Sequence, residues 1–140
     1  MMPAHIASAD LFSYAIIQED ATLKIKGRIV RLFGISIPSI NWICAGAGYP
    51  VSCETRAAVR ALNFKIQGFV YCYEQRTNPD GSITAICRNG YEDLSAYLIK
   101  QGWAVATPDA PFEYHVLENL SRTNRRGFWG YYDYGGYWPP

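Results

Sequence analysis

Residues 19–39 read EDATLKIKGRIVRLFGISIPS, and this stretch decides the fold. Leu23 and Ile25 alternate with lysines, which predicts a strand with one apolar face and one polar face. Gly27 tolerates the positive φ of a tight turn, so we expect the chain to reverse there. A second apolar, β-branched run follows and contains one charge, Arg31. A charge in such a run indicates either a solvent-facing strand or a functional group.

The composition of the chain excludes several classes of protein. With 140 residues, 15% aromatic and 18% charged, the chain is expected to fold as one globular domain with a real core. A net charge of +1 argues against attachment to nucleic acid by bulk charge. No apolar run reaches the roughly 20 residues that a membrane span needs. The first ten residues lack the basic and apolar regions of a signal peptide.

Patterns further along the chain predict the remaining elements. Apolar spacing and turn residues indicate a first strand over 11–18, a helix over 52–67 between Ser52 and Gly68, strands over 69–74 and 83–88 around a turn at 78–81, a short helix over 93–101 and a third helix over 111–126. In the third helix, Tyr114, Val116, Leu117 and Leu120 form the predicted apolar side. The aromatic tail after residue 130 is expected to lie over the domain as a strap, and Trp42 to cover the core.

The four cysteines allow three disulfide connectivities or four reduced thiols. Cys72 and Cys87 are equally far from the turn at 79–80, so they can face each other across the hairpin. Cys44 and Cys53 then close a short loop at the entrance to the first helix. Buried reduced thiols are the alternative. Disulfides would indicate an oxidising compartment. With two histidines and no Cys-x-x-Cys, a zinc site is not expected.

Three segments resemble the staphylococcal-nuclease-like (thermonuclease) family. In the first stretch, the positions that match the family pattern are Thr22, Leu23, Ile25, Gly27, Val30, Arg31, Leu32, Gly34, Ile35 and Pro38. Residues 93–106, DLSAYLIKQGWAVA, and residues 125–130, RRGFWG, match two later family segments. The resemblance implies an α+β, mainly β fold: a five-stranded OB-type barrel with three helices over residues 13–130. Residues 1–12 would be an extension and 131–140 an aromatic tail.

The same resemblance points to a site whose chemistry has changed. Arg31 is the only family catalytic position that is retained. Ala21, Ser36 and Ser39 stand where the family has the acids that bind calcium and orient water, and Ser82 stands where it has a second arginine. The family's calcium site is therefore predicted to be lost, and no cofactor is expected. Glu19, Asp20 and Asp80 are acids that a rearranged site could recruit, although solvated turn charges are their ordinary interpretation.

A second candidate surface lies near the end of the third predicted helix. It comprises Arg122, Arg125, Arg126, Tyr131 and Tyr132, which could hold a phosphate or a base. The alternative is a cation-rich helix C-terminus, which the helix dipole favours.

These observations predict an exported nuclease-fold domain that has lost phosphodiesterase activity and acts as a binding or structural module. The alternatives are an active nuclease with a rearranged site and a module associated with the envelope or with exopolysaccharide. Resemblance to small exported bacterial proteins implies a periplasmic or secreted location, and we expect a monomer. Nucleic acid and polysaccharide, bound weakly, are the ligand classes that remain open.

Overall fold

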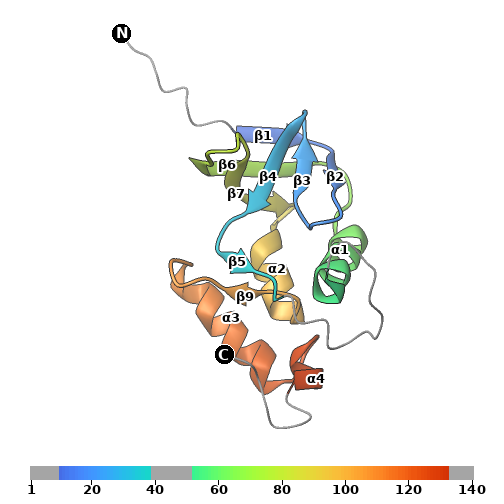
Figure 1. The fold of residues 1–140 in the computed structure, drawn as a ribbon, viewed down its shortest axis with the longest axis vertical. Coiled ribbons are helices and arrows are strands. Elements are labelled where there is room, and N and C mark those ends of the chain that lie inside the picture. Colours follow the sequence, from blue (N-terminus) through green and yellow to red (C-terminus); the bar gives the residue numbers. More distant parts are fainter. Residues whose placement is uncertain (1–9, 39–51, 133–140) are drawn as a thin grey trace.

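A strand that bends once nearly closes the main sheet into a barrel. The computed structural model describes residues 10–38 and 52–132. The strands follow the order β1 (Asp10–Ser13), β6 (Val70–Thr77), β7 (Ile83–Asn89), β4 (Arg28–Leu32), β3 (Leu23–Ile25) and β2 (Ala15–Ile17). Only Tyr14 separates β1 from β2, yet β1 pairs with β6 and β2 pairs with β3, at opposite ends of that order (Figure 1). The fold is therefore α+β, mainly β, with a barrel-like sheet.

The predicted hairpin over residues 23–32 forms β3 and β4, and β4 lies at the centre of the strand order beside β7. Leu23 pairs with Val30 in antiparallel register, and Val30 pairs with Ile83 of the parallel neighbour β7. All three side chains are fully buried, as are most inward residues of these strands. The alternation read from the sequence therefore becomes the inside and outside of the barrel.

Three helices cover one end of the sheet, and a short fourth helix follows them (Figure 1). They are α1 (Cys53–Lys65), α2 (Leu94–Gln101), α3 (Phe112–Thr123) and α4 (Trp129–Tyr132). Ser52 caps α1, as predicted, by accepting a hydrogen bond from the Thr55 amide. Asp93 caps α2, which ends at Gly102 in the left-handed conformation. None of the helices described here is both long enough and apolar enough to cross a membrane.

Two short strands were not predicted from the sequence: β8 (Glu92–Asp93), which pairs with the end of β7, and β9 (Val105–Ala106). A third, β5 (Ile35–Ser36), falls within the β-rich run that was expected to continue to Pro38, but it is separate from β4 and pairs with β9 in a second sheet. Elements of two residues carry too little periodicity to be recognised in a sequence. Their position depends on the partner that tertiary structure supplies.

Several predicted boundaries were wrong. The first strand is interrupted at Tyr14, where it changes partner. Helix α1 ends before Ile66, which is already extended, rather than at Gly68. Helix α3 ends at Thr123, three residues earlier than predicted, and Arg125 has a φ of 55° that no helix accommodates.

The predicted apolar side of α3 was only partly correct. Tyr114 is buried and Leu117 packs against the core, whereas Val116 and Leu120 are exposed. The second part of α3 therefore presents apolar side chains to solvent instead of to the barrel.

The hairpin disulfide is confirmed: Cys72 and Cys87 are direct partners in the β6–β7 register and are bonded to each other. Both cysteines are fully buried. Cys53 is also disulfide-bonded. Cys44, its predicted partner, lies outside the described residues, as do Trp42, Ser39 and the tail after residue 132.

Candidate functional site

Two hairpin turns of the same construction lie on either side of β4 in the sheet. In the first, Gln18 begins the turn and Thr22 ends it; in the second, Asn78 and Ser82 hold these places. In each turn the amide of the first residue donates to the carbonyl of the fifth, at 2.8 Å in both. The amide of the fourth residue donates back to the carbonyl of the first, at 3.1 Å and 2.9 Å. The first turn leads into β3 and the second into β7, the two neighbours of β4.

An aspartate occupies the third place of each turn and binds the hydroxyl residue two positions later. Oδ1 of Asp20 accepts from the Thr22 amide at 3.0 Å and from its hydroxyl at 2.6 Å. Oδ1 of Asp80 accepts from the Ser82 amide at 2.9 Å and from its hydroxyl at 2.6 Å. Short Asp side chains favour this local hydrogen bonding in turns. Both carboxylates are therefore held in defined positions near β4.

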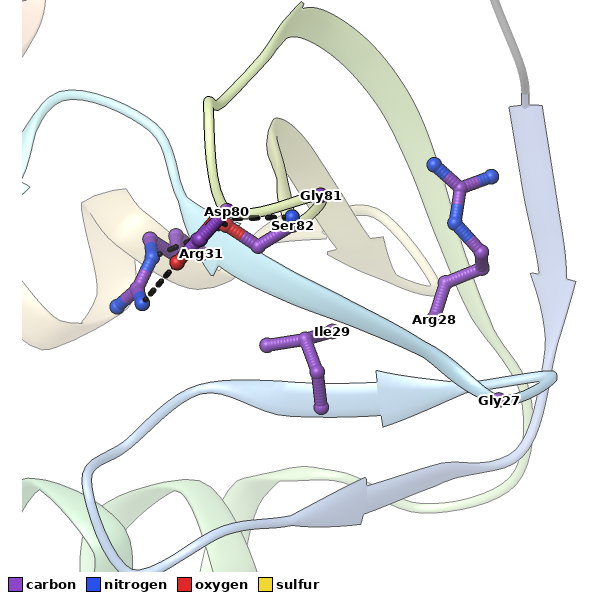
Figure 2. Close-up of a pocket in the computed structure, with 7 residues that line it drawn as sticks. All are labelled: Gly27, Arg28, Ile29, Arg31, Asp80, Gly81 and Ser82. Atoms are coloured by element: carbon purple, nitrogen blue, oxygen red, sulfur yellow. Dashed lines mark hydrogen bonds and ion pairs between the residues drawn. The ribbon is translucent and has the colours of Figure 1, made fainter.

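Arg31 of β4 reaches the second of these turns (Figure 2). Its Nη2 lies 3.3 Å from Oδ2 of Asp80, and its Nε donates to Oγ of Ser82 at 3.3 Å. The two oxygens of Asp80 thus have different partners: Oδ1 accepts hydrogen bonds within the turn, and Oδ2 pairs with the guanidinium. The Ser82 hydroxyl donates to the carboxylate and accepts from Arg31, so it links the two charged groups.

The environment lowers the pKa of both aspartates. Hydrogen bonds from the Ser82 side chain and amide, followed by the bond from Arg31, lower the pKa of Asp80 from 3.8 to about 2. Burial alone would raise the pKa of Asp20. Its bonds to Thr22 and the positive charge of Arg31 outweigh that effect, so the pKa of Asp20 is lowered. Both groups are therefore negatively charged at neutral pH.

A shallow hollow of about 380 Å³ opens beside this ion pair. It is lined by Gly27, Arg28, Ile29, Arg31, Asp80, Gly81 and Ser82. Figure 2 shows Arg28 pointing away from Asp80, on the opposite side of the hollow from Arg31. A second hollow of about 440 Å³ is lined by residues 17–20 at the first turn. Neither hollow carries two converging cations, the arrangement that would bind a phosphodiester most strongly.

The residues predicted for the site are only partly brought together. Arg31 and Ser82 are in contact, and Asp80 joins them. Ala21 is buried, with a φ of 70°, in the left-handed position of the first turn. Ser36 lies in β5 as an exposed residue of the small sheet. Ser39 falls outside the described residues.

The arginine cluster is held by structural contacts. The guanidinium of Arg122 lies 5.0 Å from the centre of the buried Trp129 ring, a cation–π contact. Arg126 donates to Oε1 of Gln101 at 2.9 Å, which ties the chain after α3 to the end of α2. Arg125 is exposed, and the side chains of Tyr131 and Tyr132 lie outside the described part of the structure.

Sequence reasoning missed the relationship between the two turns. The signal was present as a repeated pattern, Asp20-Ala21-Thr22 and Asp80-Gly81-Ser82, each directly before a buried strand. An aspartate followed two residues later by a hydroxyl residue is a typical turn motif. What the pattern could not reveal is that β4 and Arg31 lie between the two turns.

No protein-family model matches the chain, and no curated protein matches it.

Proposed function

We propose that this chain is a nuclease-fold domain that no longer cleaves phosphodiesters and serves as a binding module outside the cytoplasm. One observation carries the proposal: Arg31 lies 3.3 Å from a carboxylate, that of Asp80, whose pKa is about 2. At any working pH this carboxylate is ionised and neutralises the guanidinium. A phosphodiester would meet a carboxylate where cleavage requires positive charge.

The identity of the neighbouring residues supports the loss of activity. Ser82, which stands at the place of the family's second arginine, is buried, and its hydroxyl donates a hydrogen bond to Asp80. Ala21 offers no side-chain oxygen to a cation, and Ser36 offers no charge. Calcium prefers six to eight oxygen ligands, many of them carboxylates. Within the described ranges, no three acidic, histidine or cysteine side chains cluster as metal ligands would. These residues support the proposal that the family's calcium site is lost.

The proposal of the nuclease fold draws on the order and pairing of the elements. A bent first strand, a hairpin, a helix, a second hairpin and two further helices follow one another along the chain. The strand that carries Arg31 pairs in parallel with β7. Both features agree with the OB-type barrel that the resemblance implies.

A cleavage assay tests the loss of activity. Heat-denatured DNA is incubated with the protein, with calcium or with chelator, beside a known calcium-dependent nuclease. We expect no cleavage above the protein-free rate for the natural chain, for Arg31→Ala or for Arg28→Ala. Arg28 is the matched control because it lines the same hollow but points away from Asp80. Calcium-dependent cleavage that persists in Arg28→Ala and disappears in Arg31→Ala would contradict the proposal.

A rearranged phosphodiesterase is the second candidate, and the placement of Asp20 and Asp80 favours it. Both carboxylates lie in turns that flank β4, and the charge of Arg31 lowers the pKa of each. Two fixed acids beside one arginine could orient water near a bound phosphate. If that is the function, Asp20→Asn and Asp80→Asn should each remove the cleavage that the assay detects in the natural chain.

The Cys72–Cys87 disulfide supports the proposed location. Disulfides persist in oxidising compartments and are rare in the bacterial cytosol, so we propose the periplasm or the exterior of the cell. Intact mass measured before and after reduction tests this on protein isolated without reductant. Four free thiols would contradict an oxidising location.

A further inference from the structure

Five aromatic side chains form a continuous exposed row across β1 and β6. In order along the row they are Tyr14, Phe69, Phe12, Tyr71 and Tyr73, and we call them the aromatic strip. The centres of neighbouring rings lie 4.5, 4.9, 5.6 and 4.6 Å apart. The exposed fractions of these residues range from 36% to 67%. The largest contiguous apolar patch on the surface of a monomeric protein is often functional.

The strip follows from the pairing of the two strands. Phe12 and Tyr71 are direct partners in the β1–β6 register, and Tyr73 lies two residues further along the same face. Cys72, between Tyr71 and Tyr73, and its register partner Leu11 point inward and are buried. The barrel core is therefore complete without the strip. Its rings contribute mainly to the outer surface.

Charge at the border of the strip argues against a polyanionic ligand. The carboxylate of Asp10 accepts a hydrogen bond from the Tyr71 hydroxyl at 3.3 Å. Its negative charge is the main reason that the pKa of Tyr71 is raised. Arg88 stands opposite Tyr71 in the β6–β7 register and supplies one positive charge. Proteins that stack single-stranded nucleic acid add a positively charged groove to their aromatic residues, whereas this border carries both signs.

The area of the strip argues against a stable contact between copies of this chain. An aromatic side chain presents about 200 Å², so five rings exposed by roughly half present on the order of 500 Å². A stable interface buries about 800 Å² on each partner. The strip alone is smaller than that.

We propose that the aromatic strip binds a neutral polysaccharide. The C–H groups of a sugar ring carry partial positive charge and are attracted to the negative faces of aromatic rings. The three tyrosine hydroxyls and the Asp10 carboxylate supply hydrogen-bond partners for sugar hydroxyls at the edges of the strip. This inference names a ligand class for the proposed binding function and rests on it. It uses residues of β1 and β6 together with Tyr14 and Phe69, which adjoin these strands, and none of them contributes to the contacts of Arg31.

Affinity electrophoresis tests the proposal with defined probes. The full chain is run through native gels that contain hydroxyethyl cellulose, locust bean galactomannan or dextran, and through a gel without polysaccharide. We expect at least one of these neutral polysaccharides to retard it. The variants Phe12→Ser, at the centre of the strip, and Tyr73→Ser, at its end, should each bind that polysaccharide about tenfold more weakly, as truncation of an aromatic anchor in an interface does. Circular dichroism should show that both variants remain folded, because their side chains face solvent.

Tyr91→Ser is the matched control, since Tyr91 is fully exposed and lies outside the strip. It should be retarded as strongly as the natural chain. The proposal is overturned if none of the three polysaccharides retards the protein, or if the strip variants and Tyr91→Ser are retarded equally. It is also overturned if poly(dT) binds through the strip while the polysaccharides do not. A dimer in analytical ultracentrifugation that the strip variants abolish, with no polysaccharide binding, would overturn it as well. DNA cleavage with intact polysaccharide binding would refute the loss of catalysis but leave this site standing.

Discussion

The hydroxyl group of Tyr114 donates a hydrogen bond of 2.5 Å to Oδ2 of Asp93, and this bond joins α3 to the start of α2. Oδ1 of Asp93 accepts from the amides of Ser95 and Ala96, so one carboxylate caps α2 and anchors α3. Burial, followed by the bond to Asp93, raises the pKa of Tyr114 far above its ordinary value of 10.0. The phenol therefore keeps its proton at neutral pH and donates it in this hydrogen bond.

Replacing Tyr114 with Phe tests this junction. The ring, which packs against Gly34, is kept, and only the donor to a charged acceptor is lost. We expect the free energy of unfolding to fall by about 1.5–3 kcal/mol. Urea denaturation measures the change, with Tyr91→Phe, at a fully exposed position, as the control. Equal stability of Tyr114→Phe and the natural chain would show that the bond contributes nothing.

The pKa of Asp80 reports the contacts of the candidate site. Arg31→Ala and Ser82→Ala should each raise it from about 2 toward the ordinary 3.8, because each removes a group that favours the charged carboxylate. NMR titration of the Asp80 carboxyl measures this, and Arg28→Ala should leave the pKa unchanged. A value near 3.8 in the natural chain would mean that the ion pair does not form in solution.

The direction of the shift in pKa also fixes how this carboxylate affects stability. The folded pKa lies below the unfolded one, so the contribution of Asp80 is fully present above pH 3.8 and is lost as the pH falls toward 2. Asp80→Asn should therefore be less stable than the natural chain at pH 6. The two should converge near pH 2. A difference that is independent of pH would contradict this.

Gly102 and Gly90 distinguish two effects of adding a β-carbon, which are backbone strain at a positive φ and a steric clash with a neighbouring segment. Both have positive φ, but a Cβ at Gly102 would lie 2.1 Å from the Arg126 carbonyl oxygen, whereas one at Gly90 meets nothing within 4 Å. We expect Gly90→Ala to cost about 1–2 kcal/mol through backbone strain alone. Gly102→Ala should cost about 1–3 kcal/mol more, through the clash between the two segments. Equal losses in urea denaturation would show that the segments move apart freely.

Lys26 is the least suited residue in the β3–β4 turn. It has a φ of 51° and precedes Gly27 at 77°, so both central residues are left-handed, as in the turns that favour Asn-Gly. Lys26→Asn should stabilise the fold by about 0.5–1 kcal/mol. The control Lys24→Asn removes the same charge from an exposed strand position and should not stabilise the fold. Stabilisation by both variants would assign the effect to charge.

Sequence alone determined the elements whose signals are local. The alternation around Leu23 and Ile25, the start of the first helix at Ser52 and the end of the second at residue 101 each depend on a few neighbouring residues. Spacing around the hairpin turn also predicted the Cys72–Cys87 pair, but a β-bulge between Glu74 and Arg76 sets the register in which the two cysteines face each other. The other predictions held because each depends on a few neighbouring residues.

Tertiary structure decided the rest, including both candidate sites. Arg31 and Asp80 are 49 residues apart in sequence, and they meet because β4 pairs in parallel with β7. The aromatic strip exists because β1 pairs with β6 before the chain changes partner at Tyr14 and β2 pairs with β3. The β1–β6 pairing sets Phe12 beside Tyr71. Parallel pairing and a change of partner depend on how distant segments bury their apolar faces together. No local pattern encodes that choice.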